Sequence, residues 1–251
     1  MDAITAGLWG LLGGSALLIG AAIAWRLNLS QRIVAGVMAA GAGILISAVA
    51  FDLVDEAITV GGIASMAGGV AAGAALFTLG NMLLSRRGAA HRKRSGSHPQ
   101  ERQPSADEGN GLALALGALL DGIPESIVIG ISLIGGGQVS ASVVFAVFLS
   151  NIPEGLSSAA GMKRAGHTAV YVFGVWSAIA LASGLAALAG YTLLSGAAPE
   201  TTAFITAIAA GAILAMLVDT MIPEATETDH AASGLLATAG FLVALLLSKG
   251  G

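Results

Sequence analysis

A chain of 251 residues that is 55% hydrophobic and only 10% charged is not an ordinary soluble domain, in which roughly 25% of residues are charged. The net charge is −4, and the absence of cysteine excludes disulfides, thiolate metal ligands and cysteine nucleophiles. The composition indicates a chain whose main partner is the lipid bilayer, and no nucleic-acid partner is expected.

Apolar segments long enough to cross a bilayer follow one another along almost the whole chain. One crossing takes about 20 mainly apolar residues. We therefore predict an all-α integral membrane protein with about eight transmembrane helices, at residues 4–25, 33–57, 59–85, 111–134, 138–162, 169–194, 201–225 and 232–249. The first is expected to be a retained helix, because no basic stretch typical of a signal peptide precedes it.

A polar segment, residues 86–110, separates predicted helices 1–3 (residues 1–85) from predicted helices 4–8 (residues 111–251) within one membrane domain. It holds six Lys and Arg residues and few apolar ones, so we expect a mobile loop. Ten of the eleven basic residues fall in odd-numbered connections. The positive-inside rule then predicts that this loop is cytoplasmic and that both termini lie outside the plasma membrane.

Eight of the fifteen acidic residues fall within predicted spans, and no Lys or Arg lies deep in those spans. A charge at the centre of a span costs about 2.5–3.5 kcal/mol, so these acids should face a cavity, a proton or a bound cation. They are Asp52, Asp55, Glu56, Asp121, Glu125, Glu154, Asp219 and Glu224. Protonated carboxyls bonded between helices are the alternative for single members of the set, and the first three could instead reach the interface.

The central acids belong to a repeated pattern. Asp-Gly-Ile-Pro-Glu-Ser occupies residues 121–126, Ser-Asn-Ile-Pro-Glu-Gly occupies 150–155, and Ile-Pro-Glu returns at 222–224. Residues four apart share a helix face, which pairs the first residue of each six-residue motif with its glutamate. A proline within a helix leaves a carbonyl without its donor, and the following acid is placed to share an ion with it. The pattern predicts a carboxylate-lined cation site between the fourth and fifth helices.

At these residues the chain resembles the ZIP (Zrt-/Irt-like) family of divalent-metal transporters. That family has eight helices, a long cytoplasmic loop after the third, and a His-Asn-x-Pro-Glu-Gly motif in the fourth with a similar one in the fifth. The near two-fold arrangement of the acids is consistent with a 3+2+3 organisation with inverted repeats. The resemblance implies alternating access, in which helices 2, 4, 5 and 7 slide against the others.

The resemblance also implies a ligand set. Glu125 and Glu154 would coordinate the metal, with Asp121 and Ser150 standing where the family has histidines. A second site, using Asn151 and Glu224, is expected to be weak or absent, because Gly122 replaces the helix-four asparagine. Asp219 and the acids at positions 52, 55 and 56 also resemble the pattern of the ZIP family.

The missing histidines bear on the choice of metal. Oxygen ligands suit Mn²⁺, Mg²⁺ or Ca²⁺ and also accept Fe²⁺ or Zn²⁺, whereas the family favours zinc, iron, manganese or cadmium. We expect a divalent transition metal as the transported substrate, with a weak preference for zinc. The four histidines, at 91, 98, 167 and 230, lie outside the predicted spans, and the cationic loop is interpreted as a topology anchor.

Three other functions share part of this pattern. A proton- or sodium-coupled secondary transporter shares every gross feature, and only metal dependence separates it. A non-transporting metal sensor on the same fold would fit the lost histidines. An intramembrane enzyme is not expected, because His-Glu-x-x-His is absent and no histidine is placed to act as a buried base. The sequence leaves open whether the protein forms a homodimer.

Overall fold

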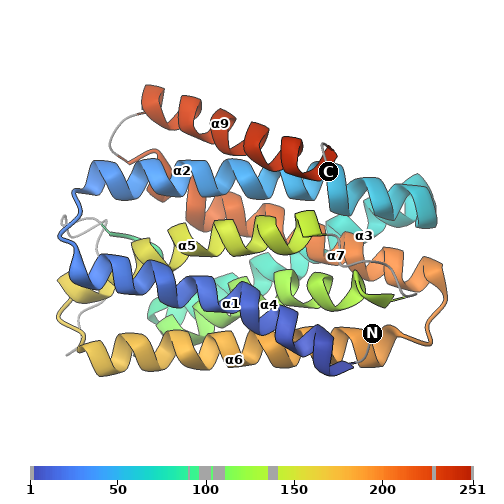
Figure 1. Ribbon diagram of the computed structural model, residues 1–251, viewed down its shortest axis with the longest axis horizontal. Coiled ribbons are helices and arrows are strands. Elements are labelled where there is room, and N and C mark those ends of the chain that lie inside the picture. The colour runs from blue at the N-terminus through green and yellow to red at the C-terminus, as the bar shows by residue number, and fades with distance from the viewer. Residues whose placement is uncertain are drawn as a thin grey trace.

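The computed structural model describes residues 3–89, 91–95, 103, 111–134, 141–227 and 230–249, and all regular structure within them is helical. The α-helices are α1 (Ala3–Arg26), α2 (Gln31–Ala48), α3 (Val54–Leu84), α4 (Gly111–Ile131), α5 (Ala141–Arg164), α6 (Ala169–Leu194), α7 (Pro199–Met216), α8 (Ile222–Ala225) and α9 (His230–Lys249). They form one elongated bundle of roughly parallel and antiparallel helices (Figure 1).

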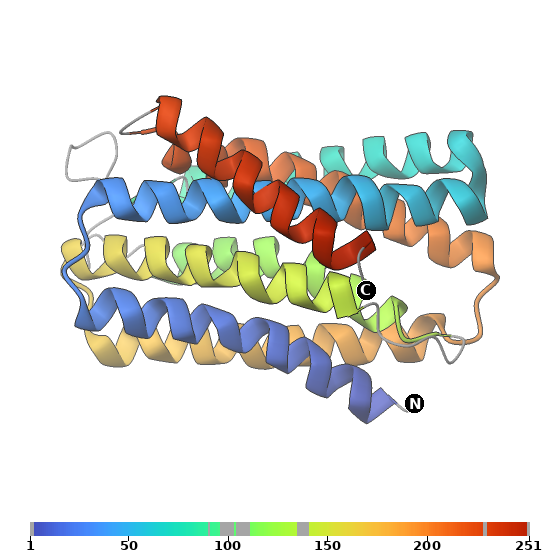
Figure 2. The same ribbon diagram turned by 45° about the horizontal axis from the view of Figure 1, so that its top comes forward.

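Seven helical segments in the described residues are long and apolar enough to cross a membrane. The second covers 57 residues, Gln31–Arg87, which as a straight helix would measure roughly 85 Å against a hydrocarbon core of about 30 Å. The backbone is not helical at Gly62, where φ is 76° and ψ is 164°, a conformation essentially confined to glycine. The chain turns back there (Figure 2), and the returning part of α3 packs along α7.

The reversal lies a few residues later than the sequence predicted. We placed the boundary between the second and third spans at residue 58, whereas the structure places it at Gly62. Nothing in the residues around position 58 disfavours a helix, so the helix continues until a residue that tolerates a positive φ. The start of the predicted fifth span, residues 138–140, lies outside the described residues.

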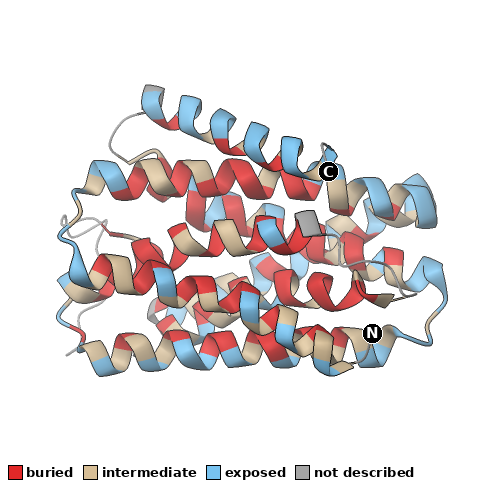
Figure 3. Cartoon of the chain, viewed as in Figure 1, coloured by how far each residue is buried: buried red, intermediate tan, exposed pale blue. Residues whose placement is uncertain are grey.

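Polarity is inverted relative to a water-soluble protein. Large apolar side chains stand on the outer surface, among them Val170, Leu193 and Leu235 with exposed fractions of 86%, 79% and 76%. Acidic side chains lie inside, with Asp121 exposed by only 1% and Glu224 not exposed. Figure 3 shows the buried residues along the inner faces of the helices and the exposed ones outside. The prediction of an all-helical fold is confirmed for the described residues, and their seven long apolar segments are consistent with a multi-pass membrane protein.

Glycine allows α1 and α5 to approach closely, and this contact positions the central acid of α5. A Cβ on Gly20 would overlap the carbonyl oxygen of Ile152, and a Cβ on Gly155 would overlap that of Leu17. Small residues at such crossings let membrane helices pack backbone against backbone. The position of Glu154 on α5 is therefore fixed by the close packing of α5 against α1.

Two helices carry matching π-helical turns that the sequence did not reveal. α2 and α7 each run for 18 residues and pass into a five-residue π turn, Val49–Leu53 and Leu217–Met221 respectively. The first turn contains Asp52 and the second contains Asp219. Such turns occur often at functional sites, and here each presents an aspartate from the same part of its helix.

Candidate functional site

The predicted acids of the fourth and fifth helices lie together in the interior. Asp121 and Glu125 come from α4, Glu154 comes from α5, and their exposed fractions are 1%, 2% and 5%. We call these three side chains the central carboxylates. Each of the two helices contains the proline of its motif, Pro124 or Pro153. The Oε1 atom of Glu125 and the Oε1 atom of Glu154 are both buried without a hydrogen-bond partner.

Two cations from the chain itself pair with Asp121 and Glu154. The guanidinium of Arg92 donates from Nε to Oδ2 of Asp121 at 2.8 Å and from Nη2 to Oδ1 at 2.7 Å. The ammonium of Lys93 lies 3.2 Å from Oδ2 of Asp121 and 2.8 Å from Oε2 of Glu154. Arg92 is 1% exposed and Lys93 is 3% exposed. Burial alone would lower the pKa of Lys93, but Asp121 and Glu154 outweigh it and hold that pKa above its ordinary value.

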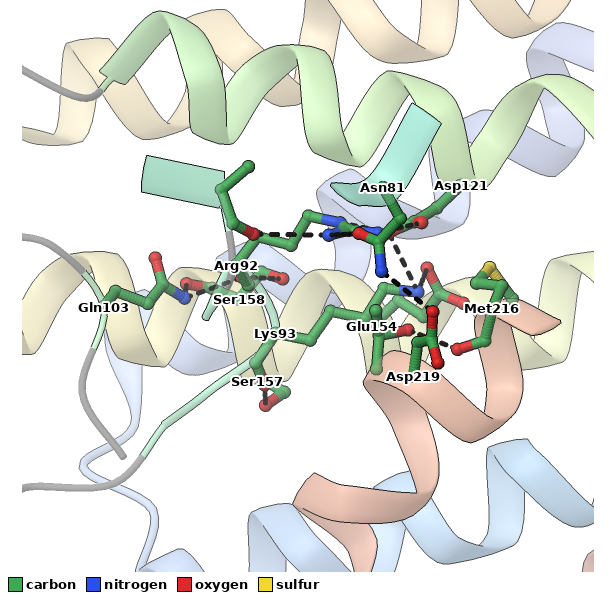
Figure 4. A network of polar contacts seen from close by, with 12 residues as sticks. Asn81, Arg92, Lys93, Gln103, Asp121, Glu154, Ser157, Ser158, Met216 and Asp219 are labelled. Atoms are coloured by element: carbon green, nitrogen blue, oxygen red, sulfur yellow. Dashed lines mark hydrogen bonds and ion pairs between the residues drawn. The ribbon is translucent and has the colours of Figure 1, made fainter. Parts of the chain in front are cut away.

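The network extends to two more helices. Nη1 of Arg92 donates to Oδ1 of Asn81 on α3 at 2.8 Å, and Nδ2 of Asn81 donates to Oδ2 of Asp219 at 2.9 Å. A continuous polar chain therefore runs from Asp219 through Asn81 and Arg92 to the central carboxylates (Figure 4). Asp219 joins it through the π turn that follows α7.

The backbone that carries these cations is anchored to α5. Oγ of Ser158 donates to the carbonyl of Arg92 at 2.9 Å, and Oγ of Ser157 donates to that of Lys93 at 2.8 Å. Nε2 of Gln103 donates to the carbonyls of Arg92 at 2.8 Å, Arg94 at 3.1 Å and Ser158 at 2.9 Å. Within the segment expected to be a mobile loop, residues 92, 93, 95 and 103 are thus buried and hydrogen-bonded to the bundle.

Glu224, a ligand expected for the second site, is bound by the same segment. The backbone N–H of Ser95 donates to both of its carboxylate oxygens, at 3.1 and 3.2 Å. The hydroxyls of Ser95 and Ser157 both donate to its Oε1. The carboxylate is fully buried, and these donors satisfy it without a cation.

Two predicted ligands face other neighbours. Oγ of Ser150 donates to the carbonyl of Val147 on its own helix at 3.0 Å. Nδ2 of Asn151 donates to the carbonyl of Gly13 on α1 at 3.0 Å. Both side chains are buried, but their hydrogen bonds tie α5 to itself and to α1 rather than to the central carboxylates.

The acids of the second predicted helix form a separate group. Oδ1 of Asp52 accepts from Oγ of Ser248 at 2.6 Å, and Lys249 lies 3.9 Å from Asp55. The Asp55 side chain is 68% exposed, and Glu56 is also exposed. Asp52 and Asp55 contact the end of α9, which agrees with the alternative that these acids reach the interface.

In the part of the chain that the structure describes, no three His, Asp or Glu side chains are arranged to hold a metal ion. The reason is visible at the centre, where Lys93 lies between Asp121 and Glu154. No known family model matches the chain, and no curated protein matches it either. Fold and site together define a multi-pass helical membrane protein with an ion-paired polar centre.

Proposed function

We propose that the chain transports divalent cations across the membrane and that the central carboxylates bind the cation on its way. One observation carries the proposal. Glu125 and Glu154 each keep a buried carboxylate oxygen without a partner, which is costly in a low-dielectric interior unless a cation or a proton arrives. Three acids converge there from two proline-containing helices.

The helix-breaking prolines support a cation path at this depth. Pro124 leaves the carbonyl of Leu120 without its helical donor, and Pro153 does the same for Leu149. In membranes, backbone of this kind is tolerated where it is buried in protein or lines a cavity. Freed carbonyls next to carboxylates form an oxygen-rich environment that suits a hard or borderline dication.

The topology that we infer has eight crossings. The long run Gln31–Arg87 contributes two of them, separated at Gly62, and the other six segments contribute one each. An even number puts both termini on the same side, and the distribution of basic residues favours the outside. The matching π turns after α2 and α7 support inverted repeats with α4 and α5 between them.

The substrate class follows from the ligands and from the resemblance to ZIP transporters. We infer a divalent transition metal, with zinc, manganese, iron and cadmium as candidates and zinc weakly preferred. The carboxylates at the centre offer only oxygen ligands, so manganese is screened beside zinc. A proton- or sodium-coupled carrier and a non-transporting metal sensor on the same fold are the alternatives, because buried acids within membrane spans also mark proton and ion pathways.

Uptake into proteoliposomes tests the proposal. Zn²⁺, Mn²⁺, Fe²⁺, Cd²⁺, Mg²⁺ and Ca²⁺ are screened with the wild-type chain, Glu125→Gln and Glu154→Gln. Glu200→Gln is the matched control, because Glu200 lies exposed in the first turn of α7. We expect uptake of one or a few ions, lost in both central variants and kept in the control. Folded protein that takes up none of the six ions would contradict the proposal.

A further inference from the structure

The segment His91–Ser95, which we call the inserted segment, supplies two positive charges at the place where a divalent cation would bind. Arg92 uses both oxygens of Asp121, and Lys93 bridges Asp121 to Glu154. Arg92 and Lys93 together therefore place the same +2 charge beside the central carboxylates as a divalent cation would.

The fit of this segment is built into the neighbouring helices. Gly117 of α4 leaves room for the Arg92 side chain, whose Cδ would lie 2.6 Å from an added Cβ. Gly161 of α5 leaves room for the backbone, because an added Cβ would overlap the carbonyl oxygen of Arg94 and the amide of Gln103. A side chain at Gly161 would displace the backbone of the segment, and one at Gly117 would displace the side chain of Arg92.

The segment also holds separate elements together. Arg92 bonds to Asn81 of α3 and to Asp121 of α4. Lys93 pairs with Glu154 of α5, and Ser95 bonds to Glu224 of α8. Helices connected in this way cannot shift relative to one another without breaking charge-assisted hydrogen bonds. While docked, the segment therefore fixes the bundle as well as filling the site.

We propose that the inserted segment is a tethered competitor of the transported cation, which must leave the central carboxylates before a divalent ion can bind there. The exchange conserves charge, since two protein cations depart and one dication arrives. A monovalent ion would replace only half of the lost charge, so the competitor also selects for divalent cations. This inference rests on the proposed function, whose site it regulates.

Removing one competing charge tests the proposal. Lys93→Gln should lower the concentration of divalent cation needed for half-maximal binding by at least about tenfold, the lower end of what close charge pairs contribute. Arg87→Gln is the matched control, because Arg87 lies exposed just before the segment. Equal affinities in wild type and Lys93→Gln would overturn the proposal.

Locking the segment provides a second test that does not remove a charge. The hydroxyls of Ser95 and Ser157 bond to the same oxygen of Glu224, and the natural chain has no cysteine. The pair Ser95→Cys and Ser157→Cys should therefore form a disulfide. Oxidised protein should lose uptake, reduction should restore it, and each single variant should be insensitive to oxidation.

The outcomes separate the two claims. If the disulfide forms and uptake continues unchanged, the segment is not a competitor although the chain is a transporter. A pair that fails to cross-link in folded protein would also overturn the inference, because the docked geometry would be wrong. If neither wild type nor Lys93→Gln binds or moves any divalent ion, the proposed function itself fails.

Discussion

Substituting Gly161 by alanine should undock the inserted segment without touching a charge. The added Cβ overlaps the carbonyl oxygen of Arg94 and the side-chain amide of Gln103. The two N–H groups of that amide are shared among three carbonyls, and each N–H bond contributes about 1 kcal/mol. Their loss weakens docking by about 2 kcal/mol, roughly a thirtyfold shift in the docking equilibrium. Alanine in mid-helix favours α5 itself by about 0.5–1 kcal/mol, so the fold should survive.

The assay is the labelling rate of a single cysteine at position 95. Ser95 is fully buried and the chain has no other cysteine, so a water-soluble maleimide reports only undocking in a Ser95→Cys background. We expect Gly161→Ala to accelerate labelling at least tenfold. Gly174→Ala is the matched control, because a Cβ at Gly174 meets nothing within 4 Å. An unchanged rate in Gly161→Ala would refute the account of how the segment is held.

Two further predictions concern stability in detergent. Gly62→Ala should destabilise the protein by about 1–3 kcal/mol, because alanine resists the backbone angles at the reversal; thermal unfolding measures this, and a midpoint equal to that of Gly68→Ala would contradict it. Arg92→Met should cost about 3–5 kcal/mol by leaving the buried Asp121 with Lys93 as its one remaining ion-pair partner, and adding Asp121→Leu should recover most of the loss. Strictly additive effects in that double-mutant cycle would mean that the pair does not interact.

Hydropathy was sufficient to predict most helices, because a bilayer requires long apolar runs whatever their neighbours. The break at Gly62 was missed because its signal is a single permissive glycine among many in this chain. The π turns at Val49–Leu53 and Leu217–Met221 were missed because a π turn leaves no period in the sequence.

The central acids were predictable and their partners were not. The Pro-Glu motifs mark Glu125 and Glu154 locally, and spacing adds Asp121. No short-range pattern in the sequence links Arg92 to Asp121, which lies 29 residues away. The basic residues of the 86–110 loop were already explained by the positive-inside rule. Asn81 did offer a signal, since it is a polar amide within a predicted span.

Asn151 shows a limit of arguments from motif resemblance. The resemblance implied a ligand of the second site at Asn151, yet its amide bonds to the carbonyl of Gly13 on α1. Helical spacing states which residues share a face, and it does not state which neighbouring helix that face meets. The close packing of α1 on α5 at Gly20 makes α1 the neighbour that supplies the hydrogen-bond partner of Asn151.

The most direct test compares divalent-cation uptake by three forms reconstituted in parallel: wild type, Lys93→Gln and Glu154→Gln. At a limiting cation concentration, we predict that Lys93→Gln exceeds wild type and that Glu154→Gln does not exceed protein-free vesicles. Equal uptake by all three forms would contradict a cation site at the central carboxylates.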